Sequence, residues 1–218
     1  MAGKKLSKGL AAIVAAAAML GSASCYTDYF VRKEDSSQHA SQKVNETKRS
    51  KLAVLLIDMQ DSFLGGILPA EREKEIPYQL EVLEYCRQNN VPVIVLEYER
   101  HGPTTKVLKD KVESLELKDY ITKSWNDGFK ETSLEEKLRS YGTETVLLMG
   151  VNASACVIST AEGALNAGFK IMASKDLMAD DCYWFLPGEM ADWYKEMGIY
   201  RDSYKDILEL LKGQQPRD

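Results

Sequence analysis

Residues 147–161 read LLMGVNASACVISTA, and this stretch indicates the kind of fold that the chain adopts. An apolar run is followed by Gly150 and then by small residues of helical composition, which is the pattern of a strand that turns into a helix. Such a turn places Cys156 at the carboxyl edge of a parallel sheet, where open α/β folds bind ligands. Free N–H groups and the positive end of a helix dipole point there as well. We therefore expect the pKa of Cys156 to lie below that of a free thiol.

Strands and helices alternate along most of the remaining chain. Residues 52–58, LAVLLID, are a continuous apolar run typical of a central parallel strand that is buried on both faces. Further strands are expected at 91–96, 119–123, 145–149 and 169–173, and helices at 77–90, from 132 onward, at 154–167 and at 203–211. The alternation predicts one α/β domain over residues 51–213, a doubly wound three-layer α/β/α fold with a central parallel sheet.

The first 50 residues have a different composition. Three lysines precede the Ala-rich apolar residues 10–20, which are followed by Gly-Ser-Ala-Ser-Cys at 21–25. A basic start, a short apolar stretch and small residues predict a signal peptide over residues 1–24. The apolar stretch is about half the length that a membrane-spanning helix needs. Residues 25–50 are polar and predict a solvated tether.

The position of Cys25 sharpens the prediction of export. Residues 21–25 resemble a bacterial lipobox, although Ser22 stands where that pattern prefers leucine. Lipidation of Cys25 would give a membrane-anchored lipoprotein, and plain secretion would give a secreted or periplasmic protein. The alternative to both is an uncleaved Ala-rich helix. We expect an exported protein.

Charge and cysteine spacing narrow the classes of partner. The formal net charge is −5, and removal of residues 1–24 takes away three lysines and no acids, which leaves −8. An acidic chain without a basic cluster does not favour nucleic acid as a partner. Cys86, Cys156 and Cys182 form no CxxC pair, so the spacing indicates neither a zinc site nor a thioredoxin-like motif. Cys86 is expected in the core, with a disulfide to Cys182 as the alternative.

Three chemically active side chains are expected at one edge of the sheet. Asp58 follows the first strand, Lys123 ends another, and Cys156 follows the strand at 145–149. Right-handed crossovers bring such strand ends together. Because the chain has only two histidines, His39 and His101, the base that acts on Cys156 is expected to be a carboxylate. Taken singly, each residue also has an ordinary explanation as a loop cap, a surface lysine or a buried inert thiol.

Taken in order, the motifs are similar to those of the isochorismatase-like cysteine hydrolase superfamily, which includes nicotinamidases and N-carbamoylsarcosine amidases. The resemblance covers about residues 51 to 180. The motifs that carry it are Asp58-x-Gln60 with Phe63, then Lys123 with Gly128-Phe129, and then Gly150-Val151 followed by Cys156-Val157 and Thr160-Ala161.

The resemblance implies a role for each residue. Cys156 attacks a carbonyl carbon and forms a thioester, Asp58 carries the proton, and Lys123 holds the two in register. The backbone N–H groups of Asn152 and Cys156 form the oxyanion hole, and the Val151–Asn152 peptide is cis. Covalent catalysis of this kind divides amide cleavage into two easier steps.

The pocket and the metal content are separate expectations. Phe63, Trp125 and Phe129 are candidates for an aromatic pocket wall, with a place in the core as the alternative for each. Nicotinamidases of the superfamily carry a metal cluster with several histidines after the second strand, whereas residues 96–103, LEYERHGP, contain only His101. We therefore expect no metal and no other cofactor.

These expectations favour one function and leave two alternatives. The leading hypothesis is an amidohydrolase that cleaves a C–N bond of a small amide, ureide or carbamoyl compound through a thioester. The alternatives are ether hydrolysis of the isochorismatase type and a non-catalytic exported binding lipoprotein. The expected partners are a small-molecule amide substrate and a lipid anchor at Cys25, with a homo-oligomer left open.

Overall fold

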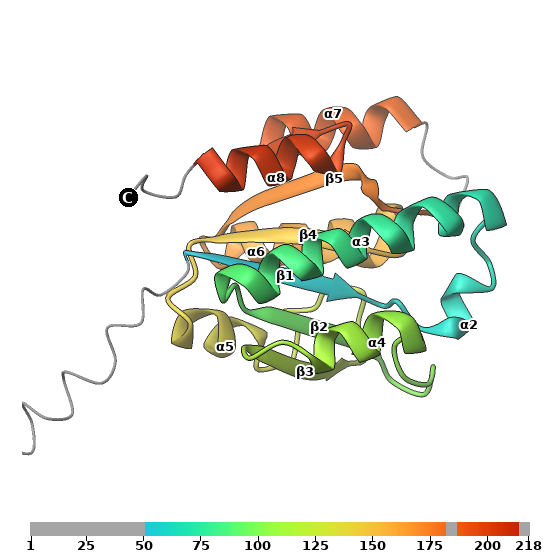
Figure 1. The fold of residues 1–218 in the computed structure, drawn as a ribbon, viewed down its shortest axis with the longest axis horizontal. Helices are drawn as coiled ribbons and strands as arrows, with labels where there is room; N and C mark the ends of the chain where they lie inside the picture. Colours follow the sequence, from blue (N-terminus) through green and yellow to red (C-terminus); the bar gives the residue numbers. More distant parts are fainter. Residues whose placement is uncertain (1–50, 182–186, 214–218) are drawn as a thin grey trace, which may run out of the picture. The chain divides into compact units, whose positions relative to one another are not determined.

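The computed structural model describes residues 51–181 and 187–213, which form a six-stranded parallel sheet with helices on both faces (Figure 1). The strand order is β3-β2-β1-β4-β5-β6, and every neighbouring pair is parallel. The strands are β1 (Leu52–Ile57), β2 (Val93–Tyr98), β3 (Lys118–Lys123), β4 (Thr145–Gly150), β5 (Lys170–Met178) and β6 (Ile199–Arg201).

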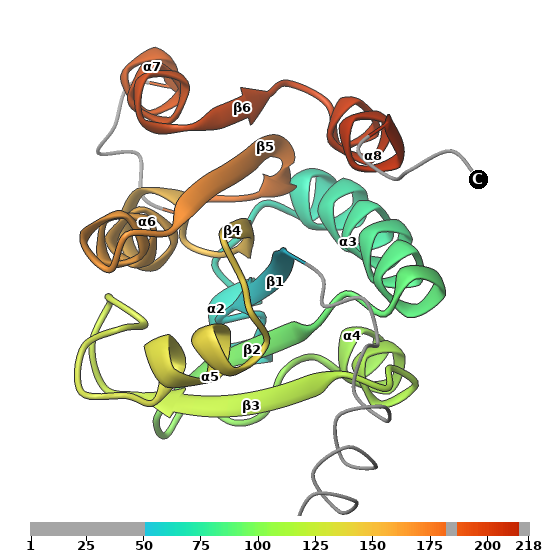
Figure 2. The same ribbon diagram turned by 90° about the vertical axis from the view of Figure 1, so that its left-hand side faces the viewer.

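The helices form the two outer layers, which Figure 2 shows on either side of the sheet. One layer holds α3 (Pro69–Asn89), α4 (Lys106–Glu113) and α8 (Tyr204–Gly213). The other holds α5 (Leu134–Ser140), α6 (Ile158–Asn166) and α7 (Pro187–Met197). Two short helical segments follow strands, namely α2 (Asp61–Leu64) after β1 and the π-helical turn η1 (Ala153–Val157) after β4. The predicted three-layer α/β/α fold is thus confirmed.

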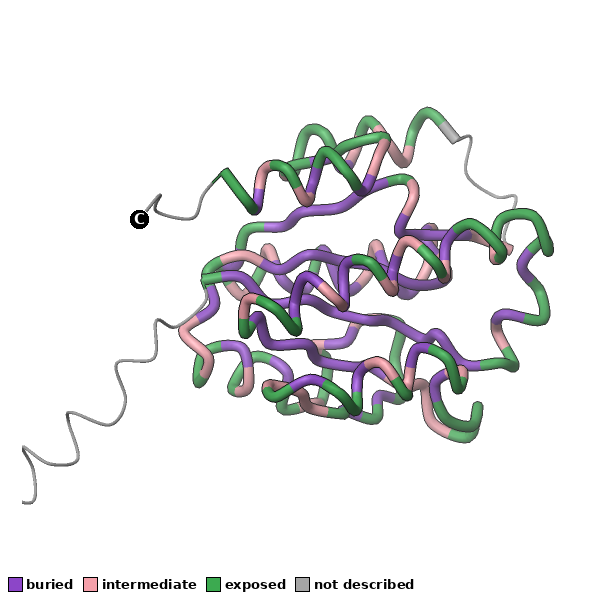
Figure 3. Tube along the Cα trace, viewed as in Figure 1, coloured by how far each residue is buried: buried purple, intermediate pink, exposed green. Residues whose placement is uncertain are grey.

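The centre of the sheet is its most buried part (Figure 3). All six residues of β1 are buried, as the apolar run predicts for a strand covered on both faces. Gly150 ends β4 with a φ of +134°, and a Cβ there would lie 2.0 Å from the carbonyl oxygen of Ile57. Only glycine allows this approach. The chains that leave β1 and β4 therefore start side by side.

This pair of strands is also where the direction of winding reverses. From β1 the chain proceeds to β2 and β3 on one side, whereas β4, β5 and β6 lie on the other side. The carboxyl ends of the strands at such a switch point enclose the crevice in which open α/β folds bind ligands. Asp58 and Cys156 follow the two strands of that pair.

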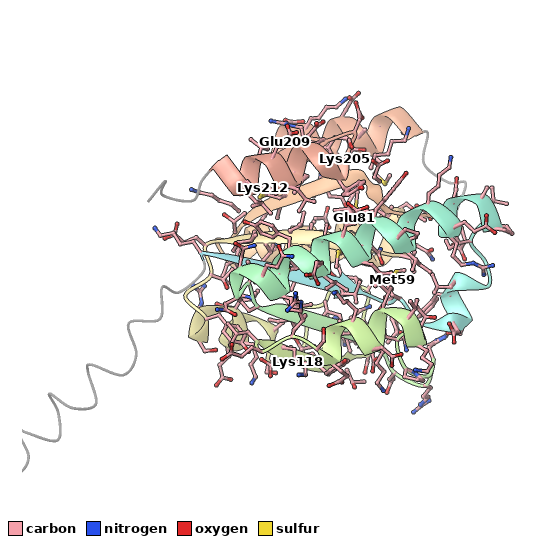
Figure 4. All side chains as sticks on the ribbon, in the orientation of Figure 1. Met59, Glu81, Lys118, Lys205, Glu209 and Lys212 are labelled. Carbon is pink, nitrogen blue, oxygen red and sulfur yellow. The ribbon has the colours of Figure 1, made fainter. Side chains whose placement is uncertain are left out.

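Several elements differ from the expected ones. Helix α3 begins at Pro69 rather than at Pro77, which lies inside the helix. The first half of α3 lacks a clear apolar pattern because it buries two polar residues, Glu75 and Gln79. Gln79 Nε2 donates to Glu75 Oε1 at 2.6 Å and to Leu177 O at 3.1 Å, and it contacts the sulfur of Met59, labelled in Figure 4, at 3.6 Å.

Two further differences concern the second half of the chain. Strand β5 runs on to Met178, past a register shift against β4, and the helix expected at 154–167 opens with the π-helical turn η1. α4, α7 and β6 were not predicted. Cys86 is buried in the core as expected. Cys182, Cys25 and the predicted signal peptide and tether lie outside the described residues. Within 51–181 and 187–213, no helix combines the length and apolarity that crossing a bilayer requires.

Candidate active site

A buried ion pair lies at the carboxyl edge of the sheet. Lys123 Nζ, at the end of β3, donates to Asp58 Oδ2 at 2.7 Å, and both side chains are at most 1% exposed. The ammonium group also donates to the carbonyl oxygen of Trp125 at 3.2 Å and lies 4.4 Å from the ring centroid of Tyr98. A buried charge needs partners of this kind to offset its lost hydration. Lys123 thus links the ends of β1 and β3 across β2.

Asp58 occupies an unusual turn. Its φ of +52° lies in the left-handed region, which aspartate tolerates better than most residues. Its N–H donates to Leu96 O at 2.9 Å, and its carbonyl oxygen accepts from Gln60 N at 2.7 Å. Burial raises the pKa of the Asp58 carboxyl group, and the charges of Lys123 and His101 oppose that rise. Its second oxygen, Oδ1, is buried and accepts no hydrogen bond from the described residues.

The Cys156 thiol belongs to the same group of side chains. It is 7% exposed, and its Sγ donates to Asn126 Oδ1 at 3.6 Å. Burial and then the negative charge of Asp58 raise the pKa of Cys156 to about 12, and Lys123 opposes this rise. The expectation of a pKa below that of a free thiol is therefore wrong for this state of the protein. The cost of desolvating a thiolate exceeds the stabilisation that the lysine supplies.

The turn after β4 arranges backbone donors around the thiol. The Val151–Asn152 peptide is cis, as the resemblance implied. Four N–H groups of the turn are engaged, namely Ala153 with Ala179 O, Ser154 with Asp180 Oδ2, and Ala155 and Val157 with Asn152 O. None of these four bonds uses the N–H of Asn152 or Cys156.

A hollow of about 400 Å³ lies between the loop after β3 and helix α6, and neither Cys156 nor Asp58 is among the residues that line it. Asn126 lines the hollow and also contacts Cys156 Sγ, so it connects the two. Trp125 lines this hollow, is 44% exposed, and has Lys130 Nζ 3.4 Å from its ring centroid. The loop approaches α6 closely, since a Cβ on Gly163 would lie 2.3 Å from Asp127 Oδ1.

The other two aromatic candidates lie elsewhere. Phe129 packs against the core on the α5–α6 side, with its ring centroid 5.9 Å from that of Phe169, so the core alternative applies to it. Phe63 stacks on His101 with their ring centroids 4.4 Å apart, and it contacts Tyr98 edge-on with a centroid distance of 6.1 Å. Neither ring lines the hollow between the loop after β3 and α6.

The loop after β2 is held by hydrogen bonds to carboxylate and amide groups. Glu97 Oε1 accepts from the N–H and the hydroxyl of Thr104 at 2.7 and 2.9 Å. The Gln60 amide exchanges hydrogen bonds with the backbone of Tyr98 and donates to Gly102 O. In the part of the chain that the structure describes, no three His, Cys, Asp or Glu residues are grouped to hold a metal ion.

The sequence does not predict a role for two residues near the site, Gln60 and Asn126. Gln60 belongs to a quoted motif, but only the structure shows that it holds the loop after β2. Asn126 stands three residues after Lys123 in a polar loop, and nothing in the sequence distinguishes it from its neighbours. Its contact with the thiol depends on how this loop packs against α6.

Comparisons with known proteins identify relatives of this chain. The family model of the isochorismatase domain matches residues 52–181. Nicotinamidase 3 of Arabidopsis thaliana is 27% identical over 152 residues, which are 60% of this chain and 74% of that protein.

Two crystal structures share the fold. An isochorismatase-like hydrolase from Alkaliphilus metalliredigens superimposes with a TM-score of 0.61 at 23% identity, covering 74% of this chain and 99% of that one. N-carbamoylsarcosine amidase from Thermoplasma acidophilum superimposes with a TM-score of 0.57 at 22% identity, covering 71% of this chain and 98% of that one. Since the family model spans more than half of the sequence, the chain belongs to the isochorismatase family of hydrolases.

Proposed function

We propose that the protein is a cysteine amidohydrolase that cleaves a C–N bond of a small amide, ureide or carbamoyl compound. One observation carries the proposal: a fully buried Lys123–Asp58 ion pair lies beside a thiol at the switch point of the sheet. A module that only binds a ligand gains nothing from burying these charges next to a thiol. The names of two similar proteins, a nicotinamidase and an N-carbamoylsarcosine amidase, point to the same type of bond.

The first half-reaction would form a thioester. Because the pKa of Cys156 is raised, the thiol is neutral at rest and must lose its proton as Sγ attacks the carbonyl carbon. Asp58 Oδ1 accepts no hydrogen bond from the described residues and is the base that takes this proton. The N–H groups of Asn152 and Cys156 stabilise the oxyanion, at roughly 3–4 kcal/mol for each donor. When the C–N bond breaks, Asp58 returns the proton to the leaving nitrogen.

The second half-reaction would restore the enzyme. Asp58 takes a proton from a water molecule, whose oxygen attacks the thioester carbonyl. The C–S bond breaks, the acid product leaves, and the proton passes from Asp58 to the Cys156 thiolate. Burial suits Asp58 to both steps because it raises the pKa of the carboxyl group toward the range in which a base accepts protons readily. Lys123 holds the carboxylate in place through its hydrogen bond to Oδ2.

The decisive test is ammonia release by the purified full-length protein from a panel of small amides, ureides and carbamoyl compounds. We expect Cys156→Ala to abolish turnover and Asp58→Asn to lower it by about 10²–10⁴-fold, the usual value of a positioned proton carrier. Cys86→Ala is the matched control, because Cys86 lies in the core and outside the site. More than a tenth of the wild-type rate in either site variant would exclude the mechanism.

Chelation tests whether a metal takes part. We expect turnover to survive exhaustive treatment with EDTA, because the loop at 97–101 offers a poor set of metal ligands. Glu97 Oε1 is engaged by Thr104, and His101 is the single histidine of that loop. Loss of turnover with EDTA that zinc, iron or manganese restores would show that this interpretation of the loop is wrong.

A further inference from the structure

The Cys156 thiol has a hydrogen-bond acceptor in the side chain of Asn126. The amide oxygen of Asn126 can only accept a hydrogen bond, so the 3.6 Å contact requires a proton on the sulfur. At the same time, the nearby Asp58 Oδ1 accepts no hydrogen bond from the described residues. The thiol proton is therefore directed to Asn126, while Asp58 lies close enough to act on the thiol through its charge and a side-chain interaction.

Asn126 is held firmly enough to serve this purpose. Its carbonyl oxygen accepts from the hydroxyl of Thr160 on α6 at 3.2 Å, and the same hydroxyl accepts from Gly128 N at 3.0 Å. The preceding carbonyl group, that of Trp125, accepts from Lys123 Nζ. The asparagine is thus fixed from α6 on one side and from the buried ion pair on the other. Its own side chain is exposed to the hollow, where a substrate can reach it.

We propose that Asn126 is a positioning residue that orients the S–H group of Cys156 and adds to the preference for the protonated thiol until the substrate replaces it. This proposal rests on the proposed function, in which Cys156 is the nucleophile. A substrate N–H group would donate to Asn126 Oδ1 in place of the thiol. The S–H group would then donate its hydrogen bond to Asp58 instead. The exchange favours compounds that carry an N–H beside the reacting carbonyl, such as primary amides and ureides, over esters and fully substituted amides.

Other charges around the thiol must stay constant in a test. Asp58 at the end of β1 raises the pKa of Cys156, and Lys123 at the end of β3 lowers it. His101, in the loop after β2, acts on Asp58 by its charge. Asp180, in the segment after β5, accepts from the N–H of Ser154 two residues before the thiol. The test therefore changes Asn126 alone and leaves these four groups in place.

The experiment measures the rate of Cys156 alkylation by iodoacetamide in the full-length protein between pH 7 and 9.5, by peptide mapping. Iodoacetamide reacts with the thiolate, so the rate reports how strongly the site favours the proton. Asn126→Ala removes the acceptor, and we expect labelling to become about two- to fivefold faster. Asn126→Asp keeps the size of the side chain and places a negative charge beside the thiol, and we expect labelling about tenfold slower.

Matched variants separate this role from simpler effects. Asn166 lines the same hollow at the end of α6, so Asn166→Ala and Asn166→Asp make the same changes there without touching Sγ. We expect Cys156 to be labelled within about twofold of the wild-type rate in both variants, because Asn166→Ala adds no charge and the charge of Asn166→Asp is more distant and screened by water. If Asn126 only blocked the access of iodoacetamide to Sγ, Cys156 in the Asn126→Asp variant would be labelled at the wild-type rate.

The proposal is overturned if Asn126→Asp labels as fast as the wild type or faster, or if Asn166→Asp slows labelling equally. Cys86 is more deeply buried than Cys156, and its labelling serves as an internal measure of unfolding. Asn126→Asp is decisive even if Asn126→Ala is unstable. Because alkylation needs no substrate, the result stands apart from the ammonia-release assay that tests the proposed function.

Discussion

At the scale of single residues, the site depends on a charge pair that is costly to bury. Neither Lys123 nor Asp58 has contact with bulk water, so each depends on the other for the stability of its charged form. Removing one partner of a buried pair leaves an uncompensated charge, whereas replacing both by neutral groups of similar size is often nearly neutral. We therefore expect the pair to contribute little net stability to the fold.

Denaturant unfolding with a double-mutant cycle tests this interpretation. We expect Lys123→Met to lower the free energy of unfolding by about 3–5 kcal/mol, because Asp58 is left buried and unpaired. The double variant Asp58→Asn with Lys123→Met should lose much less free energy of unfolding, since neither side chain is then charged. Unfolding at pH 7 followed by circular dichroism measures both. If the double variant is as unstable as Lys123→Met, the cost lies in lost packing of the lysine stem.

The residues of the site were predictable in part. That Asp58, Lys123 and Cys156 meet follows from their positions at the ends of parallel strands, which the sequence shows as apolar runs. The direction of the pKa shift of Cys156 was not predictable, because the sequence gives the sign of neighbouring charges and not the depth of burial. The contact with Asn126 was missed because it depends on the packing of a loop.

At the scale of elements, α3 shows why sequence periodicity failed in one place. The residues that face the sheet in its first half include Glu75 and Gln79, so the apolar spacing that marks a helix is interrupted. Glu75 Oε2 and Gln79 Oε1 are both buried without hydrogen-bond partners among the described residues. Burial, with a smaller contribution from the charge of Glu71, raises the pKa of Glu75 well above its usual value.

This raised pKa predicts how stability depends on pH. The folded protein holds a proton on Glu75 that the unfolded chain releases above its ordinary pKa, so stability falls as the pH rises from about 4.5 through the folded-state pKa. Glu75→Gln cannot ionise, keeps the acceptor for Gln79, and gains an amide that can donate to Gln79 Oε1. We expect it to be more stable than the wild type at pH 8 by at least about 1 kcal/mol, and by less at pH 5.

Urea unfolding at the two pH values measures the difference. Glu73→Gln is the matched control, because Glu73 lies on the same helix and is exposed. We expect the control to change stability by no more than about 0.5 kcal/mol at either pH. A stabilisation by Glu75→Gln that is equal at pH 5 and pH 8 would show that ionisation of Glu75 is not the cause.

At the scale of the whole molecule, the sequence predicted the architecture better than its details. The alternation of apolar strands with helical segments was enough for the three-layer parallel fold, because crossover connections between parallel strands leave few arrangements. Short or weakly patterned elements were missed. Strand β6 has three residues, and in α4 only Leu108 and Val112 are buried, so neither gives a strong periodic signal.

The location of the protein is the last prediction, and it depends on residues 1–50. We propose that the protein is exported and anchored through a lipid on Cys25, because a basic start, a short apolar stretch and small residues precede this cysteine. Stable anchoring needs more than one acyl chain, which a bacterial lipoprotein carries. Expressed with its native N-terminus in a bacterium, the protein should appear in the membrane fraction, and Cys25→Ser should release it or block its processing. A Cys25→Ser variant that stays equally membrane-bound would show that the apolar stretch is itself the anchor, and an uncleaved protein in the cytosol would contradict export.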